Sequence, residues 1–153
     1  MVIIFLGSKT DLEVGRTIGK YLKDFGINFK LHVASAHKTP QYLLKLIKKY
    51  ESLNKPLVYI CVAGRSNALG GFVDAQVVHP VINCPPRSNE FAGLDILSSL
   101  RMPSGVACMT VLEPDHAAMS AAKILGANEK VLLYQKRLKE KILADDAEMN
   151  KND

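Results

Sequence analysis

The chain has 153 residues, of which 48% are hydrophobic and 23% charged, a balance that suits one globular domain with a single core. Its net charge of +5 would suit a small anionic substrate, and no basic stripe interleaved with aromatic residues indicates nucleic acid as a partner. No apolar run is long enough to span a membrane, and Met1–Leu6 lacks the basic start of a signal peptide, so we expect a cytoplasmic protein without a membrane partner.

Short apolar runs alternate with amphipathic segments along the chain. The apolar runs predict five strands, at Val2–Leu6, Phe29–Ala34, Leu57–Ala63, Val81–Cys84 and Val106–Leu112. The amphipathic segments predict six helices, at 10–26, 40–51, about 68–78, about 94–100, 114–126 and about 130–148. This alternation predicts an α/β fold, a single-domain three-layer αβα sandwich with a parallel five-stranded sheet. We expect the domain to cover residues 1–149 and the tail, 150–153, to fray.

Four of these helices carry informative residues. Thr10-Asp-Leu-Glu13 predicts a capping box at the start of the first helix, and Thr39-Pro40 predicts the start of the second. Gly70-Gly71 weakens the third helix, as expected where backbone must approach a ligand or another chain. The helix at 114–125 is small and apolar on nearly every side, so it is either enclosed in the core or packed against another subunit. We expect a homo-oligomer with this helix in or near the interface.

The cysteines and the missing signature motifs narrow the chemistry. Cys61, Cys84 and Cys108 are odd in number and form no CxxC pair, so we expect free thiols in a reducing compartment. His, Cys, Asp and Glu show no metal-ligand spacing, and there is no GxGxxG, Walker or nucleophile-elbow sequence. The sequence therefore predicts neither a metal nor a cofactor.

Three polar turns follow the first three predicted strands. They are the first turn, Gly7–Asp11, the second turn, Ser35–Lys38, and the third turn, Ala63–Asn67. In an open α/β sheet ligands bind at the carboxyl ends of the strands, so we expect the three turns to line one crevice. Ser8 and the free amides of the following helix start are able to hold a phosphate, and Asp11 a ribose diol. The alternative is that these polar residues merely cap the helix.

The second and third turns carry reactive or adaptable residues. Of four histidines, only His37 lies inside such a turn, where it can act as a general base beside the Lys38 cation and the Ser35 hydroxyl. Gly64 permits close backbone approach, and Ser66 offers a hydroxyl. The alternative for the second turn is a solvated polar turn, and for the third a helix cap.

Several motifs in order resemble one family. They are Gly7-Ser-Lys-Thr-Asp11, Ser35-Ala-His-Lys-Thr-Pro40, Ala63-Gly-Arg-Ser-Asn-Ala-Leu-Gly70, Cys84-Pro-Pro86 and Ser98-Ser-Leu-Arg-Met-Pro-Ser-Gly105. The sequence from Val2 to about Gly126 resembles phosphoribosylaminoimidazole carboxylase of purine biosynthesis. The Ser-Ala-His turn is the most specific of these elements.

The family has two branches, and this chain resembles the one called class II. The mutase branch, which moves a carboxyl group from nitrogen to carbon, has Arg after the catalytic His and a second His in the glycine-rich turn. Here Lys38 follows His37, and Ala68 stands where the second His would align. The chain is similar to the carboxylase domain of the bifunctional animal enzyme, which uses carbon dioxide directly.

The resemblance implies a flavodoxin-like sandwich and a homo-oligomer, a tetramer or octamer, with sites near subunit boundaries. It implies that carbon dioxide carboxylates 5-aminoimidazole ribonucleotide (AIR) to 4-carboxy-AIR (CAIR) without ATP, biotin or metal. Ser8 and Asp11 would bind the phosphate and ribose of the nucleotide, and Lys38 would be a further anion ligand. The reacting end would be lined by Ser35, Gly64 and Ser66. His37 would take the proton from the ring carbon.

Three other functions remain as alternatives. The closest is the mutase reaction on the carbamate of AIR. The second is a non-catalytic flavin- or nucleotide-binding module, for which the fold and the Gly7-Ser8 turn are sufficient. The third and weakest is nucleic-acid binding through the net positive charge, which would make affinity fall steeply with salt. The last two leave the grouping of Ser35, His37 and Lys38 unexplained.

Overall fold

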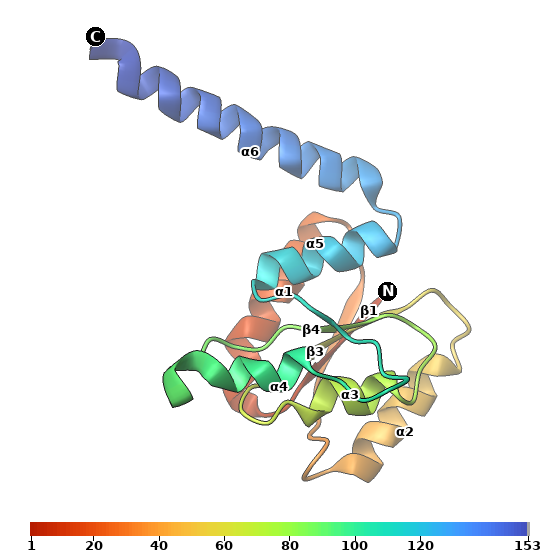
Figure 1. Cartoon of the computed structure of the whole chain (residues 1–153). Helices are drawn as coiled ribbons and strands as arrows, with labels where there is room; N and C mark the ends of the chain where they lie inside the picture. The colour runs from red at the N-terminus through yellow and green to blue at the C-terminus, as the bar shows by residue number, and fades with distance from the viewer. Residues whose placement is uncertain (153) are drawn as a thin grey trace.

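Five parallel strands form one sheet in the order β2-β1-β3-β4-β5, as the computed structural model, which describes residues 1–152, shows in Figure 1. The strands are β1 (Val2–Leu6), β2 (Phe29–Val33), β3 (Val58–Val62), β4 (Val81–Asn83) and β5 (Met109–Thr110). The order is that of flavodoxin-like folds, in which the chain reverses its winding direction between β1 and β3. The predicted fold class is therefore confirmed.

Within residues 1–152 the structure has six α-helices. They are α1 (Leu12–Asp24), α2 (Pro40–Glu51), α3 (Ala68–Asp74), α4 (Leu97–Leu100), α5 (Pro114–Ile124) and α6 (Asn128–Met149). Three 3-10 segments accompany them, η1 (Lys9–Asp11), η2 (Glu90–Ile96) and η3 (Asn150–Asn152). The predicted fraying concerns 150–153, of which residue 153 lies outside the described residues.

The two faces of β1 build two separate parts of the core. Val2, Ile4 and Leu6 pack with α1 and α5, whereas Ile3 and Phe5 pack with α2 and α3. All five residues of β1 are fully buried, which explains why the strand is a continuous apolar run rather than an alternating one.

Helix α5 is buried on one face within the chain. Its small residues, Ala117, Ala118, Ala121 and Ala122, are fully buried in the same cluster as Ile18 and Leu22 of α1. These alanines permit close packing of α5 on α1, which accounts for the small residues of this face. The opposite side of the helix includes the exposed residues His116, Lys123 and Ile124, and its place in or near a subunit interface stays a prediction.

The last predicted strand and the third predicted helix are shorter in the structure. The strand expected at 106–112 is reduced to Met109–Thr110, because the backbone N–H of Ala107 donates to the Asp74 carboxylate at 2.7 Å instead of to a strand. Helix α3 ends at Asp74 rather than near residue 78, since the chain must extend before Pro80 for its carbonyl to accept from Tyr59 N–H at 2.9 Å.

Helix α6 extends away from the body, above α5 in Figure 1. Among its described side chains only Val131 is buried, and six large apolar residues are exposed: Leu132, Leu133, Leu138, Ile142, Leu143 and Met149. Within residues 1–152, no helix combines the length and apolar character needed to cross a membrane.

Candidate active site

The three polar turns meet at the carboxyl ends of β2, β1 and β3. Backbone hydrogen bonds join the strand ends from which the turns start: Gly7 N–H donates to Val62 O at 2.8 Å, and Ala34 N–H donates to Leu6 O at 2.9 Å. A Cβ on Gly7 would lie only 3.2 Å from the Ala63 Cβ, so the first and third turns are in close contact. The first turn therefore lies between the other two, at the edge where ligands bind in this fold.

In the first turn, Ser8 and Asp11 orient each other. The Asp11 carboxylate accepts from the Ser8 backbone N–H at 2.9 Å and from the Ser8 hydroxyl at 3.1 Å. The Thr10 hydroxyl is also within hydrogen-bond contact of Ser8 Oγ. The capping box predicted at Thr10–Glu13 is wrong, because the 3-10 turn η1 precedes α1 and moves the reciprocal pairing to Ser8 and Asp11.

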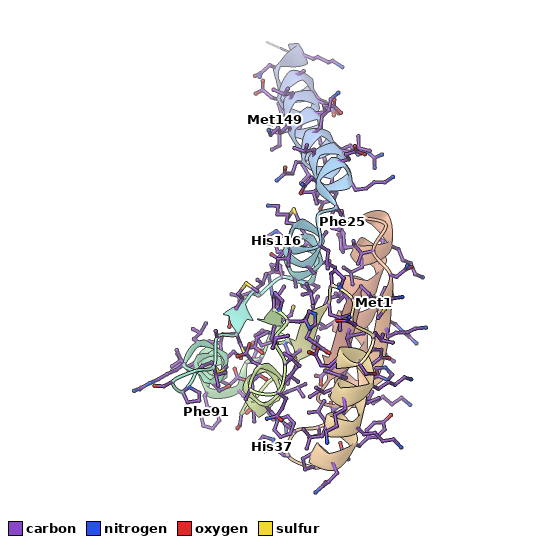
Figure 2. All side chains as sticks on the ribbon, turned by 90° about the vertical axis from the view of Figure 1, so that its right-hand side faces the viewer. Met1, Phe25, His37, Phe91, His116 and Met149 are labelled. Atoms are coloured by element: carbon purple, nitrogen blue, oxygen red, sulfur yellow. The ribbon has the colours of Figure 1, made fainter. Side chains whose placement is uncertain are left out.

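The second turn is closed by hydrogen bonds between its two ends. Ser35 O accepts from Thr39 N–H at 2.9 Å, Ser35 N–H donates to Thr39 Oγ1 at 3.0 Å, and Ser35 Oγ accepts from Lys38 N–H at 3.2 Å. Pro40 occupies the first position of α2, as predicted. These contacts fix the backbone while the side chains of His37 and Lys38 remain exposed. Figure 2 shows His37 at one end of the body and Met149 beyond the opposite end.

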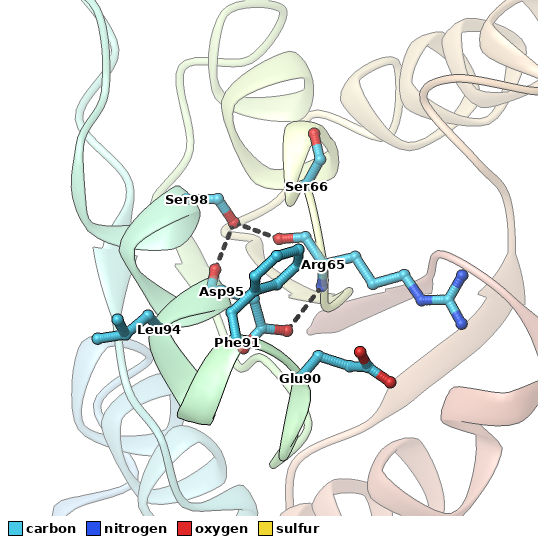
Figure 3. Close-up of a pocket in the computed structure, with 7 residues that line it drawn as sticks. All are labelled: Arg65, Ser66, Glu90, Phe91, Leu94, Asp95 and Ser98. Atoms are coloured by element: carbon cyan, nitrogen blue, oxygen red, sulfur yellow. Dashed lines mark hydrogen bonds between the residues drawn. The ribbon is translucent and has the colours of Figure 1, made fainter.

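The third turn adopts an unusual backbone conformation. Arg65 has φ +59°, in the left-handed region that L residues rarely adopt. Arg65 and Ser66 are exposed, whereas Asn67 is buried and its side-chain amide donates to Ser99 Oγ at 2.9 Å. A pocket of about 610 Å³ adjoins this turn (Figure 3). Its lining residues are Arg65, Ser66, Glu90, Phe91, Leu94, Asp95 and Ser98.

Sequence reasoning missed the contribution of η2 and α4 to this pocket. Asp95 and Ser98 are about thirty positions away from the turn they contact. The only sequence signal for this contact is the motif Ser98–Gly105, which by itself does not indicate that Ser98 bonds to the third turn. A second pocket of about 420 Å³ lies behind the turn and includes Gly64, Pro86, Asp95 and Ser99 among its lining residues.

Two other histidines, His32 and His79, lie close to polar side chains outside the three turns. His32 Nε2 lies 2.6 Å from the Tyr50 hydroxyl, and burial, with Lys49 and Lys30 nearby, lowers the pKa of His32. His79 Nδ1 lies 2.9 Å from Glu51 Oε1. His37 is the histidine that lies in one of the three polar turns, directly after the edge strand β2.

The three cysteines are free thiols, as predicted. Burial raises the pKa of Cys84 to about 12 and that of Cys108 to about 11, so both stay protonated at neutral pH. Cys61 is fully buried, and its pKa is raised as well. None of them has the low pKa typical of a catalytic thiolate.

Throughout residues 1–152, no group of three His, Cys, Asp or Glu side chains lies close enough to hold a metal ion.

The fold is that of an α/β protein whose polar turns lie at the point where the sheet reverses its winding, the place where such folds bind ligands. The model of the AIR carboxylase family matches residues 1–150, and the chain belongs to that family.

Three comparisons illustrate the relationship. The chain is 49% identical over 152 residues to phosphoribosylaminoimidazole carboxylase of Archaeoglobus fulgidus, a match that covers 96% of this chain and 83% of the relative. It is 41% identical over 139 residues to the bifunctional phosphoribosylaminoimidazole carboxylase/phosphoribosylaminoimidazole succinocarboxamide synthetase of Drosophila melanogaster, covering 91% of this chain and 32% of the relative. The crystal structure of Treponema denticola PurE matches with a TM-score of 0.95 and 44% identity over 98% of both chains.

Proposed function

We propose that the chain carboxylates AIR with carbon dioxide to give CAIR. The observation that carries this proposal is the meeting of Gly7–Asp11, Ser35–Lys38 and Ala63–Asn67 at three adjacent strand ends in a member of the AIR carboxylase family. The electron-rich ring carbon attacks carbon dioxide and forms the new carbon–carbon bond, and the ring carbon then loses its proton. The protein must hold the two reactants together, exclude water and accept that proton.

The roles that we propose for the side chains are those that the resemblance to the family implies. Ser8 and Asp11 bind the phosphate and ribose of the nucleotide in the central turn, and Lys38 supplies a further cation for phosphate or carboxylate. His37 accepts the ring proton and returns it in the reverse reaction. Ser35, Gly64 and Ser66 line the reacting end.

The proposed carboxyl donor is carbon dioxide rather than the carbamate of AIR. A mutase has to hold the carboxyl group between nitrogen and carbon, and its glycine-rich turn carries a second imidazole, whereas Ala68 offers no polar group there. Lys38, which stands where the mutase branch has arginine, supports the same branch. The similarity to the bifunctional animal protein also favours this choice.

The test is to supply each donor separately without ATP. The protein is incubated with AIR plus carbon dioxide, or with freshly made carbamate followed faster than the carbamate decomposes. CAIR should form from AIR plus carbon dioxide and should scarcely form from intact carbamate. Efficient turnover of the carbamate alone would assign the mutase reaction instead.

A homo-oligomer, a tetramer or octamer, completes the proposal. Besides the exposed apolar residues of α6, the segment η2–α4 presents Phe91, Leu94, Leu97 and Leu100 to solvent with exposed fractions of 82%, 60%, 55% and 58%. Exposed apolar patches of this kind usually mark contact surfaces.

A cytoplasmic location is proposed because free thiols persist in reducing compartments.

A further inference from the structure

Segment η2–α4 holds the backbone of the third turn from outside. The Asp95 carboxylate accepts from Arg65 N–H at 3.2 Å, and Ser98 Oγ accepts from Asn67 N–H at 3.0 Å. The Ser98 hydroxyl lies 2.7 Å from Arg65 O and 2.8 Å from Asp95 O, either of which can accept its single proton. Figure 3 shows that the contacts with the carbonyl oxygens of Arg65 and Asp95 converge on the Ser98 hydroxyl, while the Arg65 guanidinium extends away from Ser98.

These contacts flank Ser66 on both sides. Arg65, the residue before it, is fixed at both its N–H and its carbonyl, and Asn67, the residue after it, is fixed at its N–H and its side chain. Arg65 has the left-handed φ of +59°, so the turn needs external contacts to keep a conformation that an L residue disfavours.

We propose that Asp95 and Ser98 are positioning residues for the carboxylation reaction: they hold the strained third turn so that Gly64 and Ser66 face the reacting end of the substrate. This inference rests on the proposed function. Neither residue touches the reacting atoms. Their effect passes through the backbone of Arg65 and Asn67, and it should appear in turnover rather than in nucleotide affinity, because the first turn binds the nucleotide.

The experiment compares Ser98→Ala and Asp95→Ala with Asp95→Asn, which keeps an acceptor oxygen for Arg65 N–H. We expect kcat to fall about tenfold or more in both alanine variants, since small misplacements of reacting groups slow turnover by up to about 10². KM for AIR should change less than about threefold, and Asp95→Asn should retain most of the activity. Ser52→Ala is the matched control, because it removes a hydroxyl that donates to Lys49 O at 2.9 Å, at the end of α2 away from the turns.

Two further measurements separate positioning from general instability. Hydrogen exchange of the peptide 63–68 should accelerate in Ser98→Ala and stay unchanged in Ser52→Ala, whether or not AIR is the substrate. Replacing Arg65 by Gly, which adopts positive φ readily, should reduce the kcat loss caused by Ser98→Ala when measured as a double-mutant cycle. The inference is overturned if both alanine variants keep a normal kcat. It is also overturned if Ser98→Ala lowers kcat by the same factor in the Arg65→Gly background as in the wild type. A wild-type protein that exchanges as expected yet does not carboxylate AIR overturns the proposed function instead.

Discussion

The side-chain amide of Asn83 lies directly against the Cα of Gly70. A Cβ built on Gly70 would be 1.7 Å from Asn83 Oδ1 and 2.6 Å from its Cγ, so no larger residue fits without displacement. Asn83 is fully buried at the end of β4, and within the described part of the chain its amide oxygen and nitrogen have no hydrogen-bond partner. The group that lies close to Gly70 is thus a side chain of the same molecule, not the ligand or other chain that the sequence analysis expected.

We expect Gly70→Ala to lower the free energy of unfolding by about 1–3 kcal/mol, because overpacking outweighs the gain in helix propensity. In an Asn83→Ala background the same substitution should cost much less, since the obstructing amide is absent. Urea unfolding of the wild type, the two single variants and the double variant gives the coupling free energy between Gly70 and Asn83. Equal costs in both backgrounds would show that the contact does not limit this position.

His37→Asn should lower turnover by roughly 10²-fold or more while nucleotide binding survives, because asparagine is polar but cannot shuttle a proton. Steady-state rates and calorimetric binding of AIR measure the two effects. His116→Asn, at an exposed position on α5, is the control and should retain activity. A His37 variant with near-normal turnover would remove this residue from the mechanism.

His32 should make the protein less stable in mild acid. Burial, with Lys49 and Lys30 nearby, lowers its pKa below the ordinary 6.5, so the unfolded chain takes up a proton that the folded chain resists. The resulting stability is present above pH 6.5 and is lost as the pH falls through the folded pKa. Urea unfolding from pH 7.5 to 5.5 should show a shallower decline in the free energy of unfolding for His32→Gln than for wild type. Parallel curves for wild type and His32→Gln would contradict this account.

The apolar face of α6 should be needed for assembly. Leu138 and Ile142 are 45% and 67% exposed in the single chain, and burial against another copy would remove this surface from water. We expect wild type to be a tetramer or octamer by light scattering and Leu138→Gln/Ile142→Gln to shift toward smaller species. Arg137→Gln/Lys141→Gln is the control on the same helix. A wild-type monomer at assay concentration would contradict the prediction.

The parts of the fold that the sequence predicted are those set by local pattern. The buried run Val2–Leu6 and the Thr39-Pro40 helix start appear where expected, because apolar burial and φ preference act over a few residues. The parallel order of the strands brings the three turns together, and that order follows from the alternation of strands and helices.

The misses depend on contacts between distant residues. Nothing near Ser98 indicates that its hydroxyl bonds to Arg65, and nothing near Asp74 indicates that it takes the Ala107 amide away from β5. The composition of α5 was ambiguous because alanines suit a tight contact within a chain as well as between chains. The contact with α1, which the local sequence does not show, accounts for the alanines of the buried face.

The short segment Glu90–Leu100 touches two environments at once. Its inward groups, on Asp95 and Ser98, bond to the third turn, and its outward groups, including Phe91 and Leu97, face solvent in the single chain. If another copy covers the outward groups, the loss of that copy loosens the support of the turn as well. Specific activity would then depend on dilution: below the dissociation constant of the assembly, an intact and folded chain would turn over slowly, and concentrating it would restore the rate.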